Sequence, residues 1–109
     1  MKRYALIIAI ALIAHPAHAE RGLASWYAQG HRTANGEYFN PDGLTAAHRT
    51  LPFGTVLCVS DPKSGRMVKV RVTDRGPFIK KRQIDLSRGA ARALGMLGRG
   101  TMVVDIRPC

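Results

Sequence analysis

The stretch that decides the fold runs from Met67 to Phe78 and reads Met-Val-Lys-Val-Arg-Val-Thr-Asp-Arg-Gly-Pro-Phe. Its first half alternates apolar and charged side chains, which is typical of a β-strand with one buried face. The same period predicts that Asp74 shares a face with the three valines, at the end of the strand. A glycine–proline pair then turns the chain. A carboxyl group beside an apolar face at the mouth of a sheet is a candidate acid–base group.

Several other segments have strand character and are bounded by turn residues. The turn at residues 61–65 predicts a hairpin between strands at 55–60 and 66–73. Residues 29–54 read as one long loop region, and a loop of this length inside a small domain is usually functional. Further strands are expected at residues 23–28, 83–86 and 101–107.

One helix is predicted, with Ser87 as its N-cap and Arg88 to Met96 as its body. Gly95 and Gly98 are expected to end it. The pattern as a whole predicts a mainly β domain, a six-stranded barrel with one or two short helices. Closure is favoured because an open sheet of this size would expose two edges.

The N-terminus has the pattern of a secretory signal peptide. Lys2 and Arg3 precede an apolar run, and residues 17–19 form an A-x-A cleavage site. We therefore predict a signal peptide at 1–19 and a domain at 20–109, exported to the periplasm or cell wall. The rival interpretation is a retained anchor, but the apolar run is short for a membrane span. We expect no stable membrane anchor.

The domain is strongly basic. Without Lys2 and Arg3 it keeps 15 of the 17 basic residues of the chain against 7 acidic ones. For an exported protein this charge argues against nucleic acid as a partner and favours anionic envelope polymers or membrane surfaces. The alternative is that the charges only solvate the surface.

Two cysteines, Cys58 and Cys109, allow one intramolecular pairing, and an oxidising compartment makes a disulfide plausible. It would close a loop of about fifty residues and stabilise the domain by roughly 3–4 kcal/mol in the chain-entropy model. A zinc site that also uses His31 and His48 lacks the usual ligand spacing, so no metal and no other cofactor is expected.

Three residues stand out as candidates for chemistry. Glu37 follows an Asn-Gly turn, His48 lies among small residues, and Asp74 ends the strand described above. Each also has a structural interpretation: a surface carboxylate, an enclosed hydrogen-bonding histidine and a carboxylate that binds turn amides. Trp26 and Tyr27 could be core residues or could stack on a sugar ring. Asp85 is interpreted as support for the start of the helix.

Six motifs together resemble the rare lipoprotein A (RlpA) family. They occur in the family's order over residues 22–107, and Ala28 stands where a glycine is usual. The resemblance implies a double-psi β-barrel that binds peptidoglycan glycan strands, with lytic transglycosylase activity on strands without stem peptides. Glu37, His48 and Asp74 fall on the family's functional positions. The motifs are Gly22-Leu23-Ala24-Ser25-Trp26-Tyr27, Thr33-Ala34-Asn35-Gly36-Glu37, Leu44-Thr45-Ala46-Ala47-His48, Leu51-Pro52-Phe53-Gly54-Thr55, Asp74-Arg75-Gly76-Pro77-Phe78 and Asp85-Leu86-Ser87.

A lytic transglycosylase cleaves the β-1,4 bond after N-acetylmuramic acid, and the 6-hydroxyl of that sugar closes a 1,6-anhydro ring. One carboxyl group can serve as acid and then as base. We expect Asp74 in this role, kept protonated by Val72, Phe78 and Glu37. Glu37 would stabilise the oxocarbenium-like charge, and His48 would orient a carboxylate or bind the sugar.

Substrate contacts are expected from Trp26, Tyr27, Arg49 and Arg75. The chain is expected to act as a monomer. Two alternatives stay open at this point. The first is a non-catalytic, expansin-like module that only binds peptidoglycan. The second is a secreted basic effector or inhibitor that acts on another protein.

Overall fold

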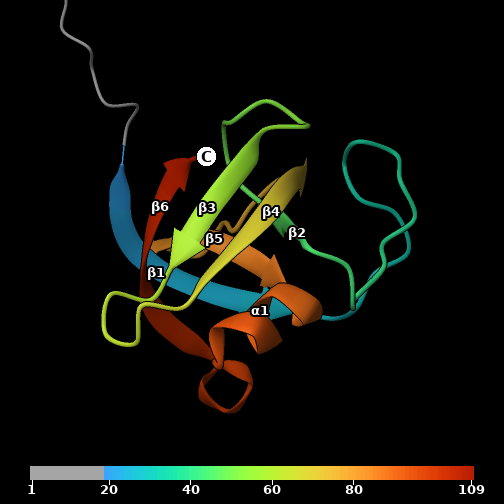
Figure 1. Ribbon diagram of the computed structural model, residues 1–109. Coiled ribbons are helices and arrows are strands. Elements are labelled where there is room, and N and C mark those ends of the chain that lie inside the picture. The colour runs from blue at the N-terminus through green and yellow to red at the C-terminus, as the bar shows by residue number, and fades with distance from the viewer. Residues whose placement is uncertain (1–18) are drawn as a thin grey trace, which may run out of the picture.

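The computed structural model describes residues 19–109, which form a closed barrel of six strands in the order β1-β5-β2-β4-β3-β6 (Figure 1). The predicted signal peptide, except Ala19, lies outside the described residues. Within residues 19–109 no helix is long and apolar enough to cross a membrane. The strands are β1 (Glu20–Tyr27), β2 (Thr45–Ala47), β3 (Val56–Ser60), β4 (Met67–Asp74), β5 (Arg82–Ser87) and β6 (Thr101–Pro108).

Five of the six strands lie where the sequence pattern predicts them, and β2 is the exception. The predicted hairpin is present, because β3 and β4 pair antiparallel from Val56↔Arg71 to Ser60↔Met67. Strand β2 lies inside the segment predicted to be loop. It has only three residues, and alanine has a low strand propensity, so neither length nor composition indicated it. Its position is set by its neighbours: it pairs parallel with β4 and antiparallel with β5.

The helix α1 (Arg88–Leu94) begins at the predicted N-cap and ends at Gly95, so it is two residues shorter than the predicted body, and Gly98 lies in the turn that follows. The Ser87 side chain accepts a hydrogen bond from the Ala90 amide, and Gly95 adopts a left-handed conformation with φ 74°. A 3₁₀ turn, η1 (Leu97–Arg99), follows and leads into β6. Gly89 allows the helix to lie against the loop at Asp42, because a Cβ at residue 89 would collide with the Asp42 carbonyl oxygen. The helix thereby fixes one end of the long loop.

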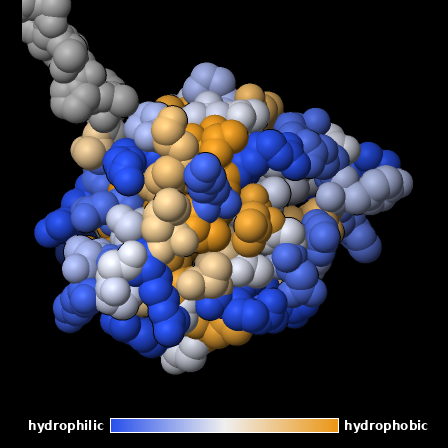
Figure 2. Space-filling model, in the orientation of Figure 1, coloured by the Kyte–Doolittle hydropathy of each residue, from blue (hydrophilic) through white to orange (hydrophobic). Residues whose placement is uncertain are grey.

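The barrel interior is filled by alternate residues of the strands, with α1 closing one end. The three valines of β4 face this core as predicted, and each is at most 6% exposed. Trp26 is partly buried and packs against the same core. On the face that Figure 2 shows, apolar side chains gather near the middle and hydrophilic ones surround them.

The C-terminus is fastened to the barrel by a disulfide. Cys58 on β3 is bonded to Cys109, 51 residues later in the sequence. The neighbouring backbone is also paired, since the Cys109 amide donates to the Val56 carbonyl. This closes the seam between β3 and β6, and the C-terminus lies beside these two strands in Figure 1.

Candidate functional site

Two aspartates lie on the strands on either side of β2. In the register of the sheet, Ala47 lies opposite Asp74 on β4 and opposite Asp85 on β5. Two strand spacings separate the Cα atoms of the two aspartates, about 10 Å. The residue between them is an alanine that is 3% exposed.

A β-bulge brings Asp74 to this position. Ala46 pairs with Val72 and Ala47 pairs with Asp74, so Thr73 is an extra residue on β4. Strict alternation would have pointed Asp74 toward the barrel core with Val72, as the sequence pattern predicted. That prediction was wrong in its direction, because the bulge turns the Asp74 side chain out toward Tyr27 and the loop.

Three donors hold the Asp74 carboxylate. Oδ1 accepts from the amides of Ala34 and Arg75, each at 2.9 Å, and Oδ2 accepts from the hydroxyl of Tyr27 at 3.1 Å. Two neighbours expected to shield Asp74 lie elsewhere: the Phe78 side chain is 81% exposed, and the Glu37 carboxylate binds Arg71. Asp74 is therefore oriented by hydrogen bonds from β1, the long loop and its own turn.

Asp85 belongs to the site, which the sequence interpretation missed. Its carboxyl group does not cap the helix, because Ser87 does; instead Oδ1 accepts from the Ser25 hydroxyl at 3.0 Å. Burial raises the pKa of Asp85, and the negative charge of Asp74 raises it further, against the opposing effects of Ser25 and Arg82. The signal was present in the sequence: Ile84 and Leu86 flank Asp85 as core residues, so Asp85 must point out of the barrel.

Tyr27 on β1 binds Asp74 and is close enough to Asp85 to be affected by its charge. Burial raises the pKa of its hydroxyl, and the charges of Asp74 and Asp85 add to the shift, so the tyrosine stays a hydrogen-bond donor. Its ring stacks on Phe39 with the centroids 4.6 Å apart and the planes within 5°. This stack connects β1 to the long loop, which stands away from the barrel at the right of Figure 1.

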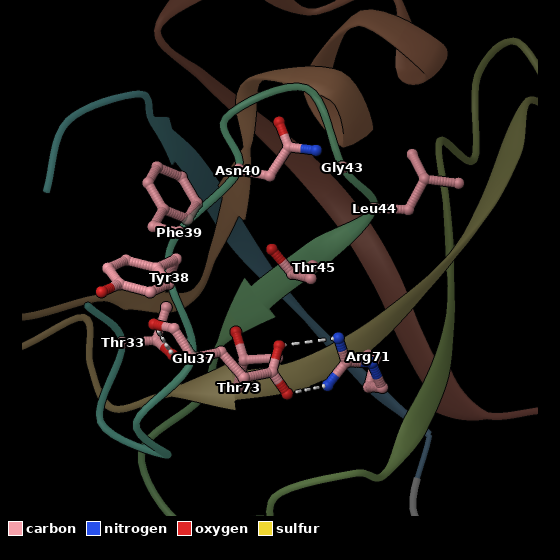
Figure 3. Close-up of a pocket in the computed structure, with 10 residues that line it drawn as sticks. All are labelled: Thr33, Glu37, Tyr38, Phe39, Asn40, Gly43, Leu44, Thr45, Arg71 and Thr73. Atoms are coloured by element: carbon pink, nitrogen blue, oxygen red, sulfur yellow. Dashed lines mark hydrogen bonds and ion pairs between the residues drawn. The ribbon is translucent and has the colours of Figure 1, made fainter. Parts of the chain in front are cut away.

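Glu37 lines a separate pocket of about 210 Å³ beside the aspartates, formed by β2, β4 and the long loop. Its carboxylate makes a two-point ion pair with Arg71, at 2.6 and 2.9 Å. It also accepts a hydrogen bond from the side-chain amide of Asn35. These donors lower the pKa of Glu37 to about 2, with the Arg71 hydrogen bond as the main cause. Figure 3 shows the pair facing each other, with Thr73 and Thr45 beside them.

The His48 side chain does not point at the carboxyl groups. Its Nδ1 accepts from the amides of Thr50 and Leu51, both at 3.2 Å, and its Nε2 lies 3.4 Å from Glu20 Oε1. The backbone of His48 does reach the site, because its amide donates to the Asp74 carbonyl at 3.2 Å. The imidazole thus shapes the loop after β2, whose backbone adjoins Asp74.

Two arginines make hydrogen bonds that hold the turn after β4. Arg49 donates to the carbonyl oxygens of Pro77 and Arg82, and to the side chain of Gln83. Arg75 donates to the His48 carbonyl, and its guanidinium lies 3.9 Å from the ring centroid of Phe53. Neither guanidinium binds the Asp74 carboxylate. Among residues 19–109, no group of three metal-ligating side chains is present.

Comparison with known proteins gives the class of this domain. Residues 19–106 match the family described as Lytic transglycolase, a double-psi β-barrel family. Because this match covers most of the chain, the protein belongs to that family, and the RlpA resemblance of the motifs is confirmed.

Two curated relatives show the particular members it is similar to. One from Synechocystis, named "Probable endolytic peptidoglycan transglycosylase RlpA", is 57% identical over 90 residues, covering 78% of this chain and 28% of the relative. One from Nostoc with the same name is 54% identical over 91 residues, covering 79% of this chain and 24% of the relative. The chain thus spans about a quarter of the length of these relatives.

Solved structures confirm the barrel architecture. A Streptomyces papain inhibitor superposes with a TM-score of 0.71 at 24% identity, covering 84% of this chain and 96% of that one. An expansin from Clavibacter michiganensis gives a TM-score of 0.70 at 25% identity, covering 84% of this chain and half of that one. The mainly β, six-stranded fold predicted from the sequence is confirmed.

Proposed function

We propose that this chain is an exported lytic transglycosylase that cleaves the bond between N-acetylmuramic acid and N-acetylglucosamine in peptide-poor glycan strands. The observation that carries the proposal is the pair of carboxyl groups, Asp74 and Asp85, on either side of Ala47. Two carboxyl groups of unlike environment on the two strands that flank β2 suit the cleavage of a glycosidic bond. Membership of the Lytic transglycolase family supports the same reaction.

The environments of the two aspartates suggest different roles. Asp85 has its pKa raised by burial, so it is the better donor of a proton to the leaving oxygen. Asp74 is held by three donors and is the better group to face the positive charge that develops on the muramic ring. Either carboxylate then takes the proton of the 6-hydroxyl as that oxygen bonds to the anomeric carbon. No water is consumed.

The other predicted residues take supporting roles in this proposal. Tyr27 orients Asp74, and the backbone of His48 holds the end of β4. Glu37 contacts substrate in the pocket beside the aspartates rather than at the reacting bond. Arg49 and Arg75 hold the turn of residues 75–82 in place through hydrogen bonds. Phe78 in this turn is exposed and can contact a sugar ring.

The test uses peptide-free glycan strands and three proteins: wild type, Asp74→Asn and Asp85→Asn. We expect soluble fragments from wild type only, with all three proteins sedimenting with the strands. Wild type that sediments with strands but releases nothing would overturn the enzyme and favour an expansin-like binder. Wild type that does neither would favour a protein partner.

A further inference from the structure

Two residues that line the pocket of Glu37 and Arg71, namely Thr45 and Thr73, have hydroxyl groups without a protein partner. These oxygens are closed off from solvent, so an entering group must displace a neighbouring side chain to reach them. Thr45 Oγ1 and Thr73 Oγ1 are buried, and neither makes a hydrogen bond with any of residues 19–109. Thr73 is 1% exposed. Because a buried hydroxyl without a partner is unfavourable, each is expected to have a ligand when the protein is at work.

The β-bulge explains why Thr73 faces this pocket. As the extra residue of β4, it lies on the outer surface of the barrel next to Asp74, while Val72 stays in the core. Thr45 lies on β2, two residues before Ala47, which separates the aspartates. Thr45 is therefore about 7 Å along β2 from Ala47, whereas Thr73 directly precedes Asp74, so the pocket adjoins the place between the two aspartates.

The charges in the pocket favour a neutral ligand. Glu37 and Arg71 carry opposite charges and pair with each other, so neither an anion nor a cation gains a net partner there. Both side chains are 43% exposed and lie at the outer side of the pocket, whereas Thr73 lies at its inner side. An exposed ion pair contributes little to stability, so an entering group can displace it easily.

The remaining lining is mixed, with Asn40 and Thr33 as polar members and two apolar side chains. Phe39 and Leu44 line the same pocket, and the Phe39 ring is fixed by its stack on Tyr27. A small neutral group with one donor, one acceptor and a methyl end matches this lining. The 2-acetamido group of an N-acetylated sugar has these three parts, with its N–H and C=O for the hydroxyls and its methyl for the apolar wall.

We propose that this pocket binds the 2-acetamido group of the sugar next to the one held between Asp74 and Asp85. The inference rests on the proposed function in that it takes the ligand to be a glycan strand. It adds that the chain recognises N-acetylation through Thr45 and Thr73. A strand that lacks acetyl groups would bind less well although its backbone is unchanged.

The test compares two neutral β-1,4-linked hexasaccharides, chitohexaose and cellohexaose, which differ only in having an acetamido or a hydroxyl group at C2. The wild-type chain is titrated with each by calorimetry. We expect chitohexaose to bind about five- to tenfold more tightly, as one or two added hydrogen bonds would give. Equal affinities would overturn the proposal.

Two substitutions at one position provide the matched control. Thr73→Val keeps the shape and removes the hydroxyl, and we expect it to bring the two affinities within about twofold of each other. Thr73→Ser keeps the hydroxyl and should keep the wild-type preference. A Thr73→Val protein that retains the preference would overturn the proposal. Thr45→Val repeats the comparison at the second hydroxyl in case the first variant does not fold.

This binding test is independent of cleavage, because neither hexasaccharide contains muramic acid. A chain that cleaves glycan strands but binds both hexasaccharides equally would refute the acetamido pocket and leave the proposed function intact. A chain that prefers chitohexaose but forms no anhydro product would keep the pocket and refute the transglycosylase.

Discussion

The hydroxyl of Tyr27 donates a 3.1 Å hydrogen bond to Asp74 Oδ2, while its ring stacks on Phe39 of the long loop. One side chain of β1 thus joins a carboxyl group at the end of β4 to the loop that covers it. Since the ring is held from one side and the hydroxyl from the other, Asp74 has little freedom to rotate. Orientation of this kind is required of a group that acts on a bound sugar.

Tyr27→Phe tests that relationship. The ring can still stack on Phe39, so we expect the free energy of unfolding to fall by only about 1 kcal/mol, the net value of one hydrogen bond. Cleavage of glycan strands should fall about tenfold, mainly in kcat. Thermal unfolding and initial rates measure the two effects. An unchanged kcat would show that the hydroxyl does not position Asp74.

Asp85→Asn should lower the activity without lowering the stability. The folded state raises the pKa of Asp85, so at neutral pH the ionised carboxyl group is less favourable in the folded than in the unfolded chain. That penalty is absent below the unfolded pKa and is fully present once the pH exceeds the folded pKa. We therefore expect Asp85→Asn to have a Tm at pH 7 equal to or above that of wild type.

The same variant should lose activity about 10²- to 10⁴-fold, the usual contribution of a general acid. The wild-type rate should also fall as the pH rises through the raised pKa of Asp85, because only the protonated carboxyl group can act as the acid. Asp105→Asn, on β6 at an exposed ion pair with Arg21, is the matched control and should keep the wild-type rate. Activity of Asp85→Asn near the wild-type level would assign the acid to another group.

Glu37 and Arg71 predict a pH effect of opposite sign. The folded state lowers the pKa of Glu37 to about 2, mainly through the Arg71 hydrogen bond. The stabilisation is fully present above the ordinary glutamate pKa of about 4.3 and is lost as the pH falls toward the folded value. Because the pair is exposed and its contribution is small, Glu37→Gln should have only a slightly lower Tm than wild type at pH 7, and the two melting curves should converge near pH 2. A constant difference between them would contradict the ion pair.

Lys81 holds an unfavourable backbone conformation, with φ 75°, in the turn before β5. A left-handed conformation is costly for a residue with a Cβ, whereas glycine adopts it readily. We expect Lys81→Gly to stabilise the protein by about 0.5–1 kcal/mol after the greater flexibility of glycine in the unfolded chain is included. Lys80→Gly removes the same charge one residue earlier and should destabilise. Urea unfolding measures the free energy of unfolding of both variants, and a Lys81→Gly protein less stable than wild type would contradict the prediction.

The sequence pattern correctly predicted the features that depend on a single strand, a single turn or a single helix cap. The alternating valines of β4, the hairpin before it and the Ser87 cap all depend on local chemistry, and each is present as predicted. What the pattern could not show were features created by pairing. Strand β2 exists because β4 and β5 lie on either side of it.

The same limit applies to the candidate site. The bulge at Thr73 arises from the register between β2 and β4, and it reverses the direction expected for Asp74. Asp85 was assigned to the helix because it precedes Ser87, yet its partner, Ser25, is 60 residues away. The partner of Glu37, Arg71, is 34 residues away. The sequence therefore indicated Asp74 and Glu37 as candidates but not Asp85, and the barrel determined which side chains meet.

The most direct test of the proposed reaction is whether an oxygen atom from water enters the product during cleavage. Peptide-free glycan strands are incubated with the wild-type chain in H₂¹⁸O, and the new ends are analysed by mass spectrometry. Closure by the 6-hydroxyl predicts 1,6-anhydro-muramic ends without ¹⁸O, and none of these from Asp85→Asn. New reducing ends that carry ¹⁸O would show hydrolysis and would contradict the proposed reaction.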